Sequence, residues 1–274
     1  MCRHLAYVGS PIFLDTLLVE PEASLIAQSQ AARKARTIVN GDGCGVGWYG
    51  ERAEPGLYRG ILPAWSDANL VSLCRQIRSP LFLAHVRAAT SGEVSTANCH
   101  PFAAGRHLFM HNGQIASYEQ LRRRVDALIP DGLYHLRRGT SDSEAIFLAA
   151  LGRGLDVDPV AAMAETLDAV MAATNGAVAV RFAAVHSDGS RLSAVRWASD
   201  EEPPSLYYRS TGTGVVVASE PCGSVGEDWR IVPPGAVLTA GRDGAMRLSS
   251  FEVTARRHRS ATASKAPGRV APAA

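Results

Sequence analysis

The second residue of the chain is a cysteine that leads directly into a short apolar segment, and this junction constrains the fold more than any other feature. Cys2 is small enough for methionine aminopeptidase to remove Met1, which would make Cys2 the first residue. Its thiol and its α-amine would then share one carbon frame. Such an amine titrates at roughly pH 7.7–8.0, so a base stands beside a nucleophile at neutral pH. Residues 4–9 are predicted to form a buried strand that holds this end in a sheet.

A cysteine near the start of a chain is weak evidence alone, because any second residue can be cysteine by chance. The hypothesis requires a group that clamps a substrate. Residues 80–86 are predicted to form a buried strand that ends at Arg87, with small residues and Thr90 after it. A guanidinium group binds a carboxylate through two parallel hydrogen bonds, so Arg87 is a candidate clamp. A structural ion pair is the alternative role.

Two further stretches supply candidates for the remaining parts of a catalytic site. Residues 107–110 form a predicted strand that ends at His111, Asn112 and Gly113. An Asn-Gly pair is a common hairpin turn, but the Asn amide and the Gly N–H are also suitable donors to an oxyanion. Asp142 lies in the first turn of a predicted helix, where the helix dipole favours a carboxylate and where it is also able to bind a substrate ammonium.

The remaining pattern mixes helices with strands in one continuous unit. Ser141 and Glu144 have the spacing of a capping box at a helix start, and Ser117 is predicted to cap the helix that follows it. The other helices and strands are predicted from the period of their apolar residues. The predicted helices cover 66–78, 117–128 and 159–173, and the later strands cover 177–186, 191–198, 205–209, 214–219, 230–232 and 236–239.

Alternating glycines occupy residues 41–47, on a predicted strand that begins at a turn. They lack the Gly-Lys-Ser/Thr ending of a phosphate-binding loop, and their spacing is not that of a dinucleotide-binding loop. Nucleotide binding is therefore rejected. Glycine inside a strand indicates that another backbone approaches closely, which is what we expect here.

The charge distribution argues against a nucleic-acid partner. The chain has 274 residues and a formal net charge of +2, but five of its 28 basic residues lie after Thr254 with no acidic residue among them. Residues 1–254 therefore carry a net charge of −3. The Ala, Pro and Ser content of residues 255–274 predicts a disordered basic tail behind a domain that covers residues 2–254.

The cysteines and the apolar segments exclude several other classes of protein. Five cysteines at irregular spacing form neither a disulfide framework nor a zinc motif, so no metal and no cofactor are expected. Apolar runs are too short to span a membrane, and the first residues do not form a secretory signal. We expect a cytoplasmic protein.

The order of these motifs resembles that of a class II glutamine amidotransferase domain, which is an N-terminal-nucleophile hydrolase. The resemblance covers about residues 2–240. The motifs that carry it are Cys2-Arg3, Gly41-Asp42-Gly43, His85-x-Arg87-x-x-Thr90, His100-Pro101-Phe102, His111-Asn112-Gly113 and Thr140-Ser141-Asp142-Ser143-Glu144. It implies an α+β fold, a four-layer αββα sandwich with two packed sheets between helical layers.

The resemblance also implies a role for each candidate residue. Cys2 would be the nucleophile and its α-amine the base, while Asn112 and Gly113 would hold the oxyanion. Arg87 would bind the α-carboxylate of a γ-glutamyl group with help from Thr90. Asp142 would bind the α-amine of the same group.

Three functions are compatible with this resemblance. The first is a Cys-dependent amidohydrolase that cleaves glutamine or a γ-glutamyl conjugate, such as γ-glutamyl-hercynylcysteine sulfoxide or a glutathione-related peptide, through a thioester on Cys2. The second is a glutaminase subunit that supplies ammonia to a separate synthase. The third is a non-catalytic protein that senses glutamine, against which the intact Cys2, Arg87, Asn112, Gly113 and Asp142 argue. The expected partner is a small γ-glutamyl molecule, with a partner enzyme or a second copy of the chain as further possibilities.

Overall fold

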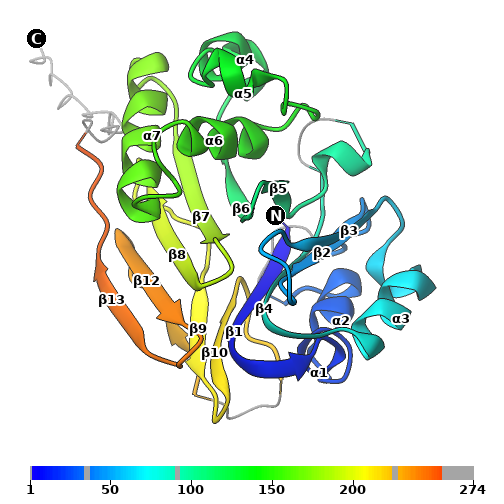
Figure 1. Ribbon diagram of the computed structural model, residues 1–274. Helices are drawn as coiled ribbons and strands as arrows, with labels where there is room; N and C mark the ends of the chain where they lie inside the picture. Colours follow the sequence, from blue (N-terminus) through cyan, green and yellow to red (C-terminus); the bar gives the residue numbers. More distant parts are fainter. Residues whose placement is uncertain (1, 34–37, 90–92, 224–227, 255–274) are drawn as a thin grey trace, which may run out of the picture.

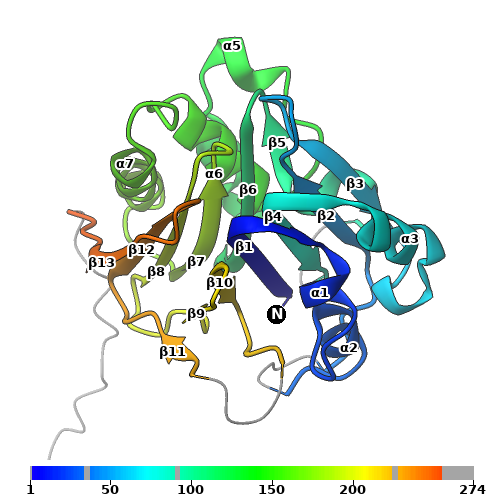
Figure 2. The same ribbon diagram turned by 60° about the horizontal axis from the view of Figure 1, so that its bottom comes forward.

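Two antiparallel sheets form the centre of the molecule in the computed structural model, which describes residues 2–33, 38–89, 93–223 and 228–254 (Figure 1). The first sheet has seven strands. In spatial order they are β11 (Arg230–Ile231), β9 (Tyr207–Ser210), β10 (Gly214–Ala218), β1 (Arg3–Phe13), β4 (Arg78–Val86), β2 (Cys44–Trp48) and β3 (Gly56–Gly60). Figure 2 shows β1 between β10 and β4, so the strand that follows Cys2 has a partner on each side.

The second sheet has six strands. In spatial order they are β13 (Met246–Ser250), β12 (Ala236–Gly241), β8 (Arg191–Ala198), β7 (Val180–Ser187), β6 (His107–Ile115) and β5 (Phe102–Ala104). Strand β6 is the strand of this sheet that packs against both β1 and β4 of the first sheet. The predicted Asn112-Gly113 stretch therefore faces the strand that carries Cys2.

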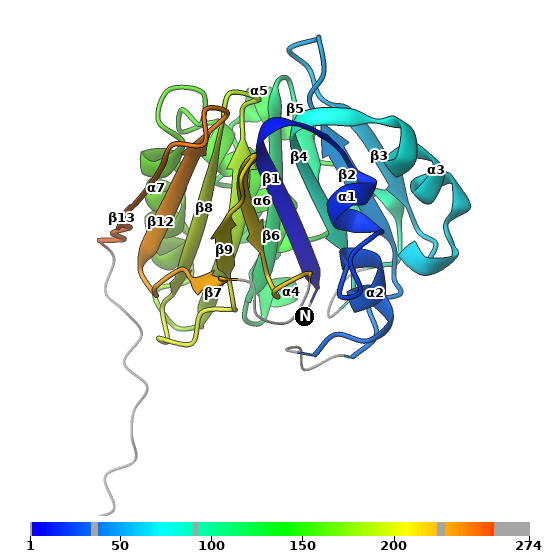
Figure 3. The same cartoon turned by 90° about the horizontal axis from the view of Figure 1, so that it is seen from below.

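The helices form an outer layer on each side of the paired sheets. The layer over the first sheet contains α1 (Asp15–Leu18), α2 (Leu25–Gln30) and α3 (Ala68–Gln76), the last preceded by the 3-10 turn η1 (Ala64–Ser66). The layer over the second sheet contains α4 (Tyr118–Asp126), α6 (Asp142–Leu151) and α7 (Pro159–Ala173), with the short α5 (Asp131–Tyr134) nearby. Figure 3 shows α1–α3 and α7 on opposite sides of the molecule. A second 3-10 turn, η2 (Thr96–Asn98), precedes β5.

Three apolar clusters separate these layers, and they explain the order of the fold. One cluster, with Phe109 and Leu167, lies between the second sheet and its helices. Another, with Leu5 and Val46, lies between the first sheet and α1–α3. The third fills the space between the two sheets. Successive strand residues point to opposite faces, so each sheet contributes one row of apolar side chains to the middle cluster. The predicted four-layer αββα sandwich is confirmed.

Most predicted elements lie within a few residues of those observed, but the hairpin alternative for Asn112-Gly113 is excluded and the predicted Ser117 cap is wrong. The Asn112-Gly113 pair forms no hairpin, because β6 continues through it and pairs Asn112 with Ala183 and Gly113 with Phe182 of β7. Ser117 makes no side-chain cap, since its φ of 56° places it in the left-handed region. Half of the predicted capping box is confirmed, as the Ser141 hydroxyl accepts a hydrogen bond from Glu144 N, while the Glu144 carboxylate accepts from Arg138 N and Gly139 N before the helix. Strands β5 and β13 and helix α5 were not predicted.

The predicted tail at 255–274 lies outside the described residues. In the part of the chain that is described, no helix has both the length and the apolar character needed to cross a bilayer.

Candidate active site

Cys2 lies immediately before β1, half-buried, with its thiol against the end of β4. The Cys2 Sγ accepts a hydrogen bond from Ala88 N at 3.3 Å and is also 3.4 Å from Ala88 O, to which the protonated thiol donates. Both protonation states of the sulfur therefore have a backbone partner. Burial raises the pKa of the Cys2 thiol, while the Ala88 N–H and the positive charge of Arg87 act in the opposite direction. A thiol with a raised pKa needs a base before it becomes a nucleophile.

Asn112 reaches across from the second sheet to the same point. Its Nδ2 donates to the carbonyl oxygen of Cys2 at 2.8 Å, so this amide holds the backbone at Cys2. The next residue must be glycine, because a Cβ added to Gly113 would lie 1.9 Å from Arg181 O and because its φ is +152°. The constraint explains why β6 carries a glycine in the middle of a paired strand.

Arg87 is buried at the end of β4, close to Cys2. Its Nη1 donates to Glu93 O at 3.1 Å, and its backbone pairs with the glycine-rich stretch through Arg87 N to Gly43 O at 2.8 Å. The Asp42 carboxylate accepts from Ala89 N at 2.7 Å and so fixes the segment that touches the Cys2 thiol. The predicted assistant Thr90 lies outside the described residues.

Asp142 is buried in the first turn of α6 and is held from two sides. Its Oδ2 accepts from Ile115 N at 2.8 Å, just beyond Gly113 on β6, and its Oδ1 is 3.3 Å from Ser143 Oγ. Ser143 Oγ is also 2.9 Å from His111 Nδ1, whose other ring nitrogen is 3.1 Å from Arg181 O. The ring of His111 therefore links Asp142 to β7 through a hydroxyl.

The loop before α6 is fastened by Glu144. Its carboxylate accepts from Arg137 Nη1 at 2.6 Å, from Gly139 N at 2.7 Å and from Arg138 N at 3.1 Å. The Arg137 and Glu144 side chains are only 4% and 6% exposed, so this ion pair is inside the protein. Arg137 also donates to Asp126, so α4 is tied to the same loop.

Asn98 joins this loop to the Arg87 side of the site. Its Oδ1 accepts from Thr140 N at 2.7 Å, and its Nδ2 donates to Glu93 O and to Thr140 Oγ1 at 3.0 Å each. Glu93 O thus accepts hydrogen bonds from both Asn98 and Arg87. Through this carbonyl the candidate clamp for a carboxylate is connected to the candidate site for an ammonium.

The structure brings together Cys2, Arg87, Asn112 and Gly113 around the start of β1, with Asp142 beside the end of β6. Sequence reasoning did not single out Asp42 or Asn98. Asp42 lies inside the Gly41-Asp42-Gly43 motif and Asn98 two residues before the His100-Pro101-Phe102 motif, but their partners are distant in sequence. The predicted close approach of another backbone to the glycines of β2 is confirmed at Gly45, where an added Cβ would lie 2.3 Å from His100 O.

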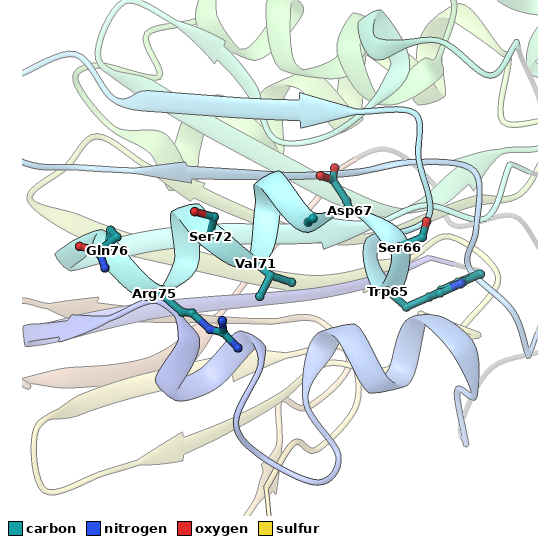
Figure 4. Close-up of a pocket in the computed structure, with 8 residues that line it drawn as sticks. Trp65, Ser66, Asp67, Val71, Ser72, Arg75 and Gln76 are labelled. Atoms are coloured by element: carbon teal, nitrogen blue, oxygen red, sulfur yellow. The ribbon is translucent and has the colours of Figure 1, made fainter.

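A surface groove lies away from these residues, along η1 and α3 in the outer helical layer (Figure 4). It encloses about 420 Å³, and its lining includes Trp65, Asp67, Ser72 and Arg75. The Asp67 carboxylate caps α3 by accepting a hydrogen bond from Leu70 N, and it accepts a second hydrogen bond from Tyr58 OH at 2.7 Å. The groove contains none of the candidate catalytic residues.

Acid is expected to destabilise the fold because several histidines are buried without charge. Burial lowers the pKa of His4 and of His186 to about 3, and it lowers those of His85, His100 and His111 as well. In the unfolded chain each of these histidines titrates near pH 6.5. Between about pH 6.5 and 3 their rings therefore bind protons in the unfolded state and not in the folded state. Stability is therefore complete above pH 6.5 and falls toward acid, by up to about 1.4 kcal/mol per pH unit for each such histidine.

The urea midpoint measured from pH 7.5 to 4.5 tests this expectation. The midpoint should fall steadily below pH 6.5. The change His186→Gln should make this fall with pH less steep, by the contribution of one histidine. A midpoint that stays level down to pH 5 would show that these histidines are not held neutral.

Comparisons with known proteins point to one family. Residues 18–202 match the family described as class-II glutamine amidotransferases. The "Probable glutamine amidotransferase DUG3" of Saccharomyces cerevisiae is 34% identical, over 87% of this chain and 81% of the yeast protein. The γ-glutamyl-hercynylcysteine sulfoxide hydrolase of Mycobacterium tuberculosis is 32% identical, over 81% of this chain and 85% of that enzyme.

Solved structures agree with this result. A glutamine aminotransferase class-II domain protein from Silicibacter pomeroyi has a TM-score of 0.72 and 36% sequence identity, and the match covers 91% of this chain and 99% of that one. The glutamine phosphoribosylpyrophosphate amidotransferase of B. subtilis has a TM-score of 0.64 at 16% identity, over 93% of this chain and 50% of that one. At that identity the likeness concerns the fold alone.

Proposed function

The chain belongs to the class II glutamine amidotransferases, and from this premise we propose that it is a γ-glutamyl amidohydrolase with Cys2 as its nucleophile. The observation that carries the proposal is the contact between the two sheets at Cys2. The Cys2 Sγ is held by Ala88, and the Asn112 amide, 2.8 Å from the Cys2 carbonyl, lies at the same point. A donor beside a nucleophile is what the oxyanion of acyl transfer requires.

The reaction proceeds in two acyl transfers. Once Met1 has been removed, the Cys2 α-amine takes the thiol proton, and the thiolate attacks the γ-carbonyl carbon of the substrate. The tetrahedral intermediate collapses when the α-ammonium returns the proton to the departing amine, which leaves a γ-glutamyl thioester. Water, deprotonated by the same amine, then releases glutamate and restores the thiol. Every proton is carried by the amine, which suits a thiol whose pKa is raised by burial.

The γ-glutamyl group is recognised at both of its charged ends. Arg87 binds the α-carboxylate, because its guanidinium is held at the end of β4, close to Cys2, and a guanidinium pairs with a carboxylate through parallel hydrogen bonds. Asp142 binds the α-ammonium from the start of α6. The hydrogen-bonded path from Arg87 through Glu93 O, Asn98 and Thr140 supports a fixed distance between these two ends.

Two versions of this function differ in the group that leaves the γ-glutamyl carbonyl. One relative carries the name of a hydrolase for γ-glutamyl-hercynylcysteine sulfoxide, and another that of a probable glutamine amidotransferase. The first name favours a dedicated hydrolase of one γ-glutamyl conjugate, and the second favours a glutaminase subunit that delivers ammonia to a partner enzyme.

Glutamate release from glutamine, glutathione and γ-glutamyl-hercynylcysteine sulfoxide separates these versions. A dedicated hydrolase should prefer one conjugate over glutamine by at least about 100-fold in kcat/KM, because a leaving-group pocket that is left empty loses binding energy in the transition state. Slow release from glutamine, with no conjugate preferred, would favour the subunit. Absence of release from all three by protein that lacks Met1 would contradict both versions.

A further inference from the structure

The space between the two sheets ends in a polar layer directly beneath Cys2. On β1 the inward-facing row runs through Val8 and Ala6 and then reaches His4. Toward the same end, the row on β4 passes through Leu81 and Leu83 to His85. The row on β6 passes through Leu108 and Met110 to Asn112.

The next residues in the first two rows belong to the catalytic layer. They are Cys2, which immediately precedes β1, and Arg87, which immediately follows β4. Each of these two rows therefore begins with apolar core residues, continues with one histidine, and ends at a candidate catalytic or binding residue. His4 and His85 are direct partners across β1 and β4, and the ring of His100 lies 4.3 Å from that of His85, centroid to centroid. We call His4, His85 and His100 the imidazole floor.

The imidazole floor and the neighbouring Asn112 contain polar side-chain atoms that the described part of the chain leaves without hydrogen-bond partners. These are both ring nitrogens of His4, His85 and His100, together with Asn112 Oδ1. All four side chains are buried, none more than 5% exposed. Unpartnered polar atoms inside a protein are costly, so this concentration calls for an explanation. No group of three or more His, Cys, Asp or Glu among the described residues has the arrangement of a metal site.

The Asn112 side chain indicates how the floor is used. Its Nδ2 is committed to the Cys2 carbonyl, so its Oδ1 points away from that carbonyl. The side chain also raises the pKa of both His4 and His85, as an acceptor oxygen close to an imidazole N–H does, against the lowering caused by burial. A neutral imidazole carries one N–H donor and is able to offer it to Oδ1 after a small ring rotation.

We propose that His4 and His85 of the imidazole floor are positioning residues, which donate to Asn112 Oδ1 and so keep the Asn112 Nδ2 directed at Cys2 and at the oxyanion. An amide is nearly symmetric in shape, and without a donor on its oxygen side it is free to turn over. Turned over, it would present an acceptor oxygen to the oxyanion and would repel it. The inference rests on the proposed function and adds residues that do not touch the substrate.

Burial is the main reason that the floor is neutral, because it lowers the pKa of all three rings. Arg3 lowers the pKa of His4 further, Arg87 lowers those of His85 and His100, and His111 acts in the same direction on all three. Asp142 acts on His111 in the opposite direction. A charged floor would compete with Arg87 for the substrate carboxylate, and a leucine floor would leave Asn112 Oδ1 without a donor.

A double-mutant cycle with glutamine as substrate tests the proposal. His4→Leu and His85→Leu should each lower kcat by about 10-fold or more with KM within 2-fold, since the oxyanion forms only in the transition state. His4→Gln and His85→Gln keep an N–H donor and should restore most of kcat. In an Asn112→Ala background the leucine changes should have no further effect on kcat.

A second buried histidine pair provides the matched control. His107 Nδ1 and His186 Nε2 are 3.0 Å apart at the other end of β6 and β7, where they partner each other. His186→Leu should lower stability without lowering kcat of the folded enzyme. If a leucine variant of the floor fails to fold, alanine takes its place in the cycle.

Several outcomes would overturn the proposal. They are an unchanged kcat in the leucine variants, an equal loss of kcat in the Asn112→Ala background, or glutamine variants as slow as the leucine ones. Turnover by the unmodified enzyme is measured first, which separates failure of the proposed function from failure of this inference. If there is no turnover, the side-chain NH₂ resonances of Asn112, identified with Asn112→Ala, decide the question. They should shift in His4→Leu and His85→Leu and remain in place in His186→Leu.

Discussion

Replacing Cys2 with alanine is expected to abolish glutamate release while the protein remains folded. Loss of a nucleophile removes the covalent path entirely, and in enzymes of this kind it lowers kcat by about 10⁴-fold or more. The fold should tolerate the change because Cys2 is half-buried and lies before the first residue of β1. Among the described residues, the hydrogen bonds of its sulfur are to the backbone of Ala88. Glutamate release and the thermal midpoint are the two measurements.

The matched control is another buried cysteine outside the site. Cys74 packs in the cluster between α3 and the first sheet, so Cys74→Ala should lose some stability and retain kcat. Intact mass establishes removal of Met1 in every sample, because a retained Met1 would place the Cys2 nitrogen in a peptide bond. A γ-glutamyl adduct should be trapped on the unmodified enzyme and be absent from Cys2→Ala. Turnover by Cys2→Ala that matches the unmodified enzyme would remove the mechanism.

Replacing Glu144 with alanine is expected to cost about 3–5 kcal/mol of unfolding free energy. The change would leave the buried Arg137 guanidinium without its closest carboxylate, and it would leave the Arg138 and Gly139 N–H groups without an acceptor. Asp126 remains near Arg137 and would recover part of the loss. Because this loop leads into Asp142, KM for a γ-glutamyl substrate should rise as well. Urea unfolding and steady-state kinetics measure the two effects.

Two further variants separate charge from geometry. Glu144→Gln removes the charge and retains one of the two oxygens that accept from the Arg138 and Gly139 N–H groups, so it should fall between the alanine variant and the unmodified protein. Asp228→Ala breaks an ion pair with Arg230 in which both side chains are exposed, and it should leave the urea midpoint unchanged. Equal effects of Glu144→Ala and Asp228→Ala would mean that burial of the Arg137 pair contributes nothing.

Local patterns were enough to predict elements whose signals are contained in a few neighbouring residues. Helix α7 was predicted over 159–173 and is observed over Pro159–Ala173, with Asp158 as its cap and proline in its first turn. Ser141 behaves likewise, since its partner is only three residues away. The four-layer architecture followed from the resemblance that the ordered motifs carry, and not from periodicity.

Features that depend on distant pairing could not be predicted in this way. Asn112-Gly113 has the local chemistry of a turn, and only its pairing with β7 keeps it inside a strand. His4 and His85 read separately as buried strand residues, and the register of β1 against β4 brings them together. The partners of Glu144 and Asn98 lie on loops with no regular pattern. In each case a tertiary contact decides between two conformations that are both acceptable locally.

The position of β1 at the centre of the seven-stranded sheet has a consequence for gene fusion. A peptide joined before Cys2 would have to leave the sheet between β10 and β4, and it would also occupy the nitrogen that the mechanism uses. Strand β13 lies at the edge of the other sheet with one side unpaired by the described strands, so a sequence added behind it meets neither obstacle. An affinity tag is therefore expected to disturb the site less behind β13 than before Cys2.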